Sequence, residues 1–267
     1  MSRVFPAPPG GLTEHDLREI SKKGYMLPGG GATTAFSSMA TAPAVVSSGG
    51  ALSYTGGDFI YAFQGNTNSF WRYSISANSW TVMATAPAVV SSGGALSYTG
   101  GDFIYAFQGA NTAAFWRYSI SANSWTVMAA APAPVHVGGA FVYAGGDFIY
   151  AFQGGTNSFW RYSISANSWT VMATAPAVVH DGGAFVYAGG DFIYAFPGGN
   201  FTAFWRYSIS ANSWTVMATA PAVVSSGGAL SYTGGDFIYA FQGNTNSFWR
   251  TTILAAPLFL AWRSWMR

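Results

Sequence analysis

The sequence predicts an all-β protein, a five-bladed β-propeller built from four-stranded antiparallel blades. Three observations lead to this fold. A unit of 44 or 45 residues occurs five times, and each unit contains four short apolar segments separated by turn residues. The array also begins with an unmatched fourth segment and ends without one. Repeats of this length, each unable to bury its apolar faces alone, are typical of propellers.

The period is read from two short strings. The string Phe-Trp-Arg begins at Phe70, Phe115, Phe159, Phe204 and Phe248. A glycine pair that opens each unit begins at Gly49, Gly93, Gly138, Gly182 and Gly227. Residues 39–72 and 217–250 are identical at all 34 positions. Copies this similar indicate recent internal duplication of a unit that packs against itself.

Each unit divides into four predicted strands, which we call a to d. In the second copy they are residues 94–98, 102–107, 115–120 and 125–128. Gly100-Gly101 forms the a–b turn, residues 108–114 form a polar b–c loop, and residues 122–124 form the c–d turn. Aromatic and β-branched residues between Gly, Asn and Pro favour strands. Strand b is apolar on both faces, which predicts that each blade packs between two others.

Aromatic residues recur at fixed places in strands c and d. Strand c carries Tyr73, Tyr118, Tyr162 and Tyr207, and strand d carries Trp80, Trp125, Trp169 and Trp214. With the apolar strand b that ends in glycine, these residues resemble the kelch repeat over about residues 36–250. Kelch repeats carry Gly-Gly where this chain has Gln64-Gly65 or Pro197-Gly198, and Thr251 replaces the fifth tyrosine. The resemblance implies that the aromatics pack blade against blade and that a terminal strand closes the ring.

The two ends of the array predict how the ring closes. Residues 36–43 align with residues 80–87, a strand d and the segment after it, but no strands a to c precede them. After Arg250 the fifth copy has no strand d of its own. We therefore expect Phe36 to Thr41 to complete the fifth blade, because pairing would remove an exposed sheet edge.

Three segments follow from this organisation. The propeller is expected over residues 36–253. Residues 1–35 form an N-terminal arm, in which Thr13 begins a capping-box-like start to a short helix through Lys23, followed by a glycine-rich linker. Residues 254–267 form an apolar and basic tail.

Composition excludes several classes of protein. A net charge of +2 with 7% charged residues provides no footprint for nucleic acid. No apolar run approaches the roughly 20 residues of a membrane-spanning helix. The chain has no cysteine, so disulfides and thiol catalysis are excluded, and we see no secretory signal. No phosphate-binding loop, dinucleotide fingerprint or nucleophile elbow is present, so we expect neither a cofactor nor an enzyme.

Most charges of the repeat region occur once per unit. The acids are Asp58, Asp102, Asp147, Asp191 and Asp236, and the bases are Arg72, Arg117, Arg161, Arg206 and Arg250. Catalysis needs residues that converge on one site. A fivefold repeat therefore indicates a structural role, in capping turns or pairing within blades.

Differences between the copies fall in the b–c loops and d–a junctions, which are expected to emerge on the same face. A rigid scaffold often carries its binding residues on such loops, although neutral drift would also produce these differences. In kelch propellers the serine before the strand a glycine often lines the pocket, and here Val137 and Asp181 replace two of these serines. The candidate binding residues are Ser48, Gln64, Asn66, Asn68, Ser92, His136, His180, Asp181 and Phe201. Two histidines and one aspartate without a spacing motif do not justify a metal site.

Two functions remain open. The first is a non-enzymatic structural or attachment subunit of a larger assembly, such as a virion, a tail or a surface layer. It would bind protein partners or self-assemble through the N-terminal arm and the C-terminal tail. The alternative is a lectin-like, multivalent glycan-binding module. A kelch-type enzyme is the least favoured interpretation, and a virion or cell-surface location is favoured over the cytoplasm.

Overall fold

The computed structural model describes residues 38–253, and this part contains strands and no helix. Residues 40–253 belong to one compact unit, in which nineteen strands form five antiparallel sheets. The all-β prediction is confirmed. The predicted helix and linker in residues 1–35, and the tail over residues 254–267, lie outside the described residues.

Each sheet is one blade, and its strands follow one another in chain order, from a to d in blades 1 to 4 and from a to c in the described part of blade 5. Blade 1 contains β1 (Ala51–Tyr54), β2 (Phe59–Phe63), β3 (Phe70–Ser74) and β4 (Ser79–Val82). Blade 2 contains β5 (Ala95–Tyr98), β6 (Phe103–Phe107), β7 (Phe115–Ser119) and β8 (Ser124–Val127). Blade 3 contains β9 (Ala140–Tyr143), β10 (Phe148–Phe152), β11 (Phe159–Ser163) and β12 (Ser168–Val171). Blade 4 contains β13 (Ala184–Tyr187), β14 (Phe192–Phe196), β15 (Trp205–Ser208) and β16 (Ser213–Val216). Blade 5 contains β17 (Ala229–Tyr232), β18 (Phe237–Phe241) and β19 (Phe248–Thr252).

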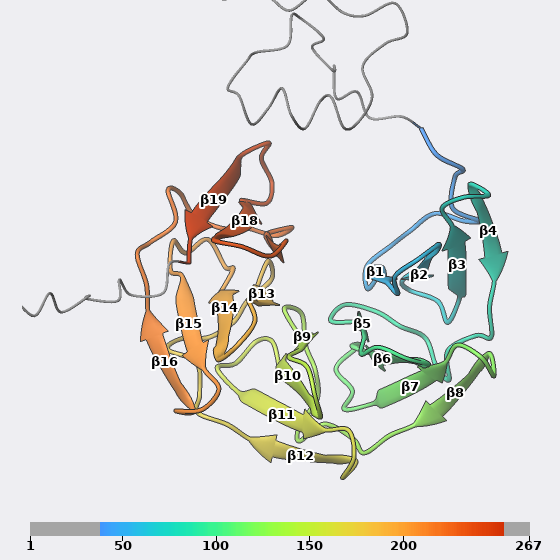
Figure 1. Cartoon of the computed structure of the whole chain (residues 1–267), viewed down its shortest axis with the longest axis horizontal. Coiled ribbons are helices and arrows are strands. Elements are labelled where there is room, and N and C mark those ends of the chain that lie inside the picture. The colour runs from blue at the N-terminus through green and yellow to red at the C-terminus, as the bar shows by residue number, and fades with distance from the viewer. Residues whose placement is uncertain (1–37, 254–267) are drawn as a thin grey trace, which may run out of the picture. The chain divides into compact units, whose positions relative to one another are not determined.

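The blades are arranged as a propeller (Figure 1), which confirms the predicted architecture. The a strands lie innermost, and the a strands of successive blades are in contact from β1 through β17. Within the described residues, blade 5 has three strands, so its outer strand β19 has no partner on its outer side. The predicted closing strand begins outside the described residues, and Ser38–Thr41 carry no strand. Closure therefore stays a prediction.

Two left-handed turns shape each complete blade. The a–b turn of blade 1 places Gly56 at φ 82° and Gly57 at φ 60°, a conformation that glycine adopts without steric cost. The c–d turn places Asn78 at φ 47°, and asparagine tolerates this region better than most residues. The Oδ1 of Asn78 also accepts a bond from the hydroxyl of Tyr73, at 2.6 Å.

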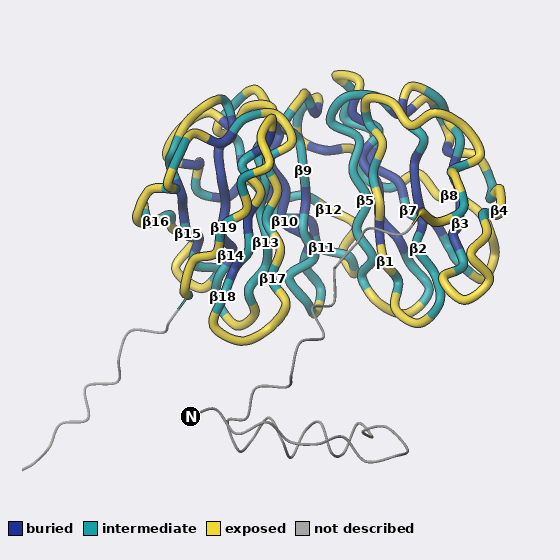
Figure 2. Tube along the Cα trace, turned by 90° about the horizontal axis from the view of Figure 1, so that it is seen from above, coloured by how far each residue is buried: buried dark blue, intermediate teal, exposed yellow. Residues whose placement is uncertain are grey.

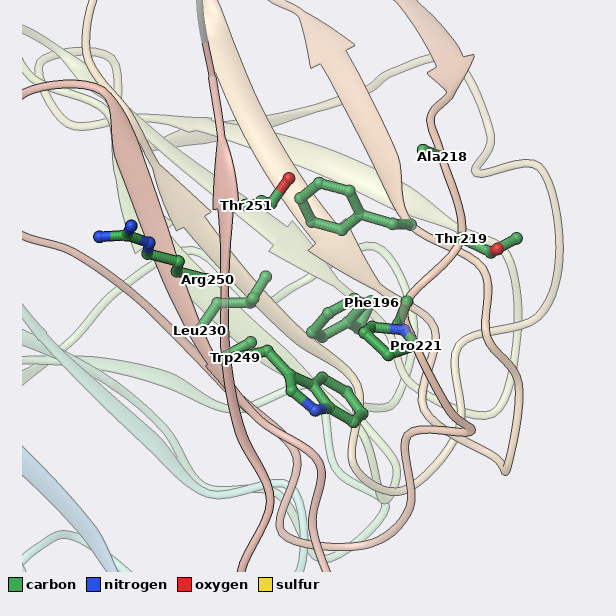
Figure 3. A pocket seen from close by; sticks show the side chains of 11 residues that line it. Phe196, Ala218, Thr219, Pro221, Leu230, Trp249, Arg250 and Thr251 are labelled. Atoms are coloured by element: carbon green, nitrogen blue, oxygen red, sulfur yellow. The ribbon is translucent and has the colours of Figure 1, made fainter.

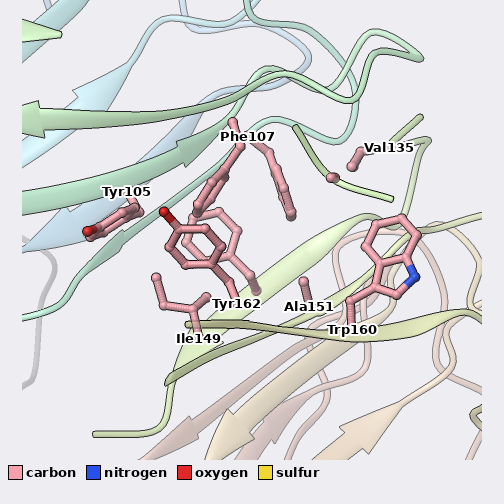
Figure 4. Close-up of a cluster of buried hydrophobic side chains, with 10 residues drawn as sticks. Tyr105, Phe107, Val135, Ile149, Ala151, Trp160 and Tyr162 are labelled. Atoms are coloured by element: carbon pink, nitrogen blue, oxygen red, sulfur yellow. The ribbon is translucent and has the colours of Figure 1, made fainter. Parts of the chain in front are cut away.

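The hydrophobic core lies between blades, as predicted from the apolar residues on both faces of strand b. Figure 4 shows Tyr105 and Phe107 of blade 2 facing Ile149 and Tyr162 of blade 3, all of them fully buried. The ring of Phe107 stacks on Trp169 of blade 3 at 5.7 Å. Aromatic pairs of this kind contribute about 0.5–1.5 kcal/mol each beyond the area they bury. Figure 2 shows the buried chain running through the middle of the blades, with the loops at both ends exposed.

The repeated Asp and Arg side chains make contacts within their own blades, as their periodicity predicts. Asp58 accepts bonds from the Ser74 hydroxyl and the Ser76 backbone N–H, both at 2.6 Å, and so caps the c–d turn. The Arg72 guanidinium lies over the Phe59 ring at 4.4 Å, a cation–π contact. The same arrangement recurs in blades 2 to 4.

The two end faces of the blade array are exposed. Phe63 and Phe70 of blade 1 are 1% and 0% exposed under blade 2. Their counterparts in an identical stretch of blade 5, Phe241 and Phe248, are 52% and 56% exposed. On the opposite face of blade 1, Leu52 is 68% exposed. Among the described residues, nothing covers these faces as the neighbouring blade covers the others.

Candidate ligand-binding site

The b–c loops and the d–a junctions lie side by side, which confirms that both emerge on one face. A backbone bridge joins the loop of blade 1 to the junction after it, Thr67 to Val90. Blades 2 and 4 repeat this bridge, Thr112 to Val135 and Phe201 to Val224. Because backbone bonds fix both segments, the side chains between them project from a rigid rim. We call this surface the loop face.

In blades 1, 2 and 4, an asparagine in the b–c loop ties that loop to the next junction. Asn66, at φ 52°, accepts a bond from the Ser91 hydroxyl at 3.0 Å. In blade 2 the same pair is Asn111 and His136, whose Oδ1 and Nδ1 atoms are 2.6 Å apart. His136 therefore takes the place that a serine holds in blade 1. Since the amide oxygen can only accept, Nδ1 of His136 carries the proton in this contact.

The second histidine lacks this partner. In blade 3 the position of Asn66 is occupied by Gly155, so the asparagine that bonds Ser91 and His136 in blades 1 and 2 has no counterpart beside His180. A Cβ at Gly199 would lie 2.7 Å from Cδ2 of His180, which shows how closely the imidazole covers this glycine. The ring of Phe201, a side chain that is 50% exposed, lies 5.9 Å from the His180 ring. His180 and Phe201 together form an accessible aromatic surface.

The predicted serine positions meet around the inner edge of the same face. The hydroxyls of Ser48 and Ser92 are 2.7 Å apart across blades 1 and 2. Across blades 4 and 5, the Ser226 hydroxyl donates to the Asp181 carboxylate at 2.5 Å. Val137 occupies this position between them and is exposed. The inner edge therefore changes from hydroxyl to apolar to acidic around the array.

These residues enclose an open depression over blades 2 to 4. It is lined by Asn111, His136, Val137, Gly155, Thr156, His180 and Asp181. The lining offers an amide, a threonine hydroxyl, two imidazoles and one carboxylate, and contains no Lys or Arg. We call it the loop-face depression. It brings together three of the nine predicted site residues.

The remaining predicted residues lie elsewhere on the loop face or are already bonded. The Gln64 amide donates to the Val45 carbonyl and accepts from the Thr67 hydroxyl, so it braces its loop. Asn66 spans Ser47 and Ser91. Asn68 is exposed, and its backbone oxygen accepts from Ala86. The sequence analysis missed Asn111, Gly155 and Thr156.

Two other features, a metal site and a membrane-spanning helix, were sought in the described residues. Within residues 38–253, no group of three or more His, Asp or Glu side chains is placed to hold a metal ion. The same part of the chain contains no helix long and apolar enough to cross a membrane.

Comparisons with known proteins bear on the fold. No family model and no curated protein matches the chain. Among solved structures, the chain is similar to one titled "Structure of YjhT", with a TM-score of 0.60 and 15% identity. The match covers 76% of this chain and 74% of the other. This likeness supports the propeller fold, and the kelch assignment stays a prediction.

Proposed function

We propose that this protein is a non-enzymatic binding module whose ligand occupies the loop-face depression. One observation carries the proposal. The depression gathers the side chains that differ most between the repeated units, His136, His180 and Asp181, into one accessible hollow. The repeated Asp and Arg side chains are instead engaged in turns and ring contacts. A rigid scaffold with variable residues on its loops suits binding.

The chemistry of the depression favours a neutral, polyhydroxylated ligand, which is the chemistry of a glycan. Hydroxyl groups both donate and accept hydrogen bonds, and Thr156, His180 and Asp181 supply both roles. The absence of Lys and Arg from the lining removes the attraction that an anionic ligand would need. The exposed ring of Phe201, beside His180, offers an apolar face against which a sugar ring can pack.

We do not propose catalysis at this site. The Asp181 carboxylate is bonded to Ser226, and the His136 Nδ1 is bonded to Asn111, so neither is joined to the other as an acid–base pair. General acid–base catalysis requires such groups within hydrogen-bond reach of the reacting atoms.

Display on a larger assembly is compatible with this function. A glycan-binding propeller would serve as an attachment subunit of a virion, a tail or a surface layer. The segments proposed to dock it, residues 1–35 and 254–267, lie outside the described residues. A kelch-type ancestry is part of the same proposal and rests on the repeat pattern.

A glycan array probed with the full chain tests the function. His136→Ala, His180→Ala and Asp181→Asn should each weaken the signal of the glycans that bind. The chain supplies a matched control in His15→Ala, because His15 is its remaining histidine and precedes the repeats in the sequence. If no glycan binds, or if all three site variants bind like the wild type, the proposed function is wrong.

A further inference from the structure

The outer edges of the four complete blades are nearly identical and open. Strand d is the last strand of each of these sheets, and Figure 1 shows it on the outside of the array. In blade 1 this strand is β4, with the sequence Ser-Trp-Thr-Val. Residues 76–88, which include β4, contain no Asp, Glu, Lys or Arg. The same stretch recurs in blades 2 to 4 with one change, Ala130 in the place of Thr85.

The backbone of strand d carries hydrogen-bonding groups that face away from its own blade. The Met83 N–H donates to the Phe70 carbonyl of strand c. Because the direction of these groups alternates along an antiparallel strand, those of Thr81 also point to strand c, and those of Trp80 and Val82 point outward. Among residues 38–253, no backbone bond from outside the blade engages Trp80 or Val82. An open edge of this kind is a template for another strand.

Each of these edges also exposes a valine at the same place. Val82 is 67% exposed, and its counterparts Val127, Val171 and Val216 are 69%, 66% and 64% exposed. Natural proteins usually protect an edge strand with charged side chains, a proline or a bulge, or keep it short. Strand d is four residues long in each complete blade, but it contains no charge and no proline. An uncharged edge with an exposed apolar side chain, present four times, favours association.

We propose that strand d of a complete blade pairs antiparallel with strand d of a second copy of this protein. In β4, Thr81 then lies opposite the same threonine of the second copy, because its own backbone groups point inward. Trp80 lies opposite the valine of the second copy, and these two residues exchange backbone bonds. Threonine pairs and aromatic–valine pairs across strands are both stabilising. This surface is independent of the ligand proposed for the loop face.

The edge itself favours a second copy as the partner. Antiparallel pairing of two identical strands is symmetric, so each favourable contact is made twice. Two identical edges that carried charge would place like charges close together, which destabilises pairing. These edges carry none, so they do not repel one another. Because one molecule has four such edges, several weak contacts can act together when copies assemble.

The described edge of blade 5 differs from the other four. Its outer described strand is β19, with the sequence Phe-Trp-Arg-Thr-Thr, so it carries the charge of Arg250. Trp249 and Thr251 of this strand line a cavity of about 180 Å³ with Phe196 of blade 4 (Figure 3). Blade 5 therefore lacks, among the described residues, the uncharged Ser-Trp-Thr-Val edge. Pairing between copies is expected at blades 1 to 4.

Sedimentation velocity of the full chain at increasing concentration tests this surface. The wild type should form species larger than a monomer, in a fraction that rises with concentration. Lysine in place of all four valines should abolish these species, because a charge at the edge opposes pairing. The control adds the same charge at exposed alanines of the c–d turns, away from the edge. The edge set is Val82→Lys, Val127→Lys, Val171→Lys and Val216→Lys, and the control set is Ala77→Lys, Ala122→Lys, Ala166→Lys and Ala211→Lys.

The comparison of the two sets decides whether the edge carries the association. Larger species that persist in the control set and disappear in the edge set support the proposal. A wild type that stays monomeric at the highest concentration would overturn it. Equal behaviour of the two sets would also overturn it, because the association would then not depend on strand d.

Cysteine crosslinking provides a second readout that adds no charge, since the chain has no cysteine of its own. Directly opposite residues place their Cβ atoms about 4.5–5.5 Å apart, so cysteines at the strand d threonines should join two copies under mild oxidation. The control places cysteines at the four turn alanines. Crosslinks several-fold more frequent in the threonine set support edge pairing, and equal frequencies in both sets contradict it. The threonine set is Thr81→Cys, Thr126→Cys, Thr170→Cys and Thr215→Cys.

Discussion

Nδ1 of His136 lies 2.6 Å from Oδ1 of Asn111, across the boundary between a d–a junction and the b–c loop that precedes it. The equivalent bond in blade 1 is made by Ser91 to Asn66, at 3.0 Å. The fold therefore accepts either residue at this position. A histidine here adds an imidazole to the loop-face depression while keeping the bond that holds the loop.

His136→Ser should separate binding from stability. Because serine makes the same bond in blade 1, the variant should keep the wild-type melting temperature within a degree or two. Its affinity for a glycan should fall, since the imidazole is absent from the depression. Calorimetric titration and a thermal melt on the same preparation check both. A large loss of stability with unchanged affinity would assign His136 a structural role.

Acid should destabilise the propeller through the capping aspartates. Bonds from Ser74 and Ser76 lower the pKa of Asp58 below its usual value, and Asp102, Asp147 and Asp191 are lowered in the same way by their own serines. A folded-state pKa below the unfolded value gives stability that is present above the unfolded pKa, near 4. It is lost as the pH falls through the lower folded pKa.

Melting temperatures between pH 6 and pH 2.5 check this dependence. Converting Asp58, Asp102, Asp147 and Asp191 together to asparagine should flatten the curve. If the melting temperature of the variant with all four substitutions still falls steeply in acid, other titratable groups cause the dependence.

The exposed end faces predict unequal costs for one substitution in two identical stretches. Phe70→Ala removes a fully buried ring between blades 1 and 2, which should cost about 3–5 kcal/mol. Phe248→Ala removes a ring that is 56% exposed, and its cost should be a fraction of that. Denaturant unfolding of both variants measures the difference. Equal costs would mean that the end face of blade 5 is covered in solution.

The strands were predictable because each lies between punctuation that the repeat supplies five times. Of the eight strand ends predicted for the second copy, three coincide with those of β5 to β8 and five differ by one residue. The exposed end faces were not predictable in the same way. Residues 39–72 and 217–250 are identical, so the sequence does not distinguish a blade in the middle of the array from a terminal one.

Only part of the candidate site could be predicted, because the sequence shows which residues break the repeat but not which side chains they contact. His136, His180 and Asp181 break the repeat and are visible in the sequence, and the structure places them together. Asn111 follows the pattern of Asn66 and reads as a turn residue, so its bond to His136 could be found only in three dimensions. Gln64 was predicted to bind a ligand, but its side chain is hydrogen-bonded to the Val45 carbonyl and the Thr67 hydroxyl. The sequence alone does not show these two bonds.

The most direct test of the binding function is the proton resonance of the histidine rings during a glycan titration. The chain has three histidines, so each ring can be assigned by single substitution. Binding in the loop-face depression predicts saturable shifts of His136 and His180, with His15 unmoved. Saturable binding that leaves both of these rings unshifted would contradict the account.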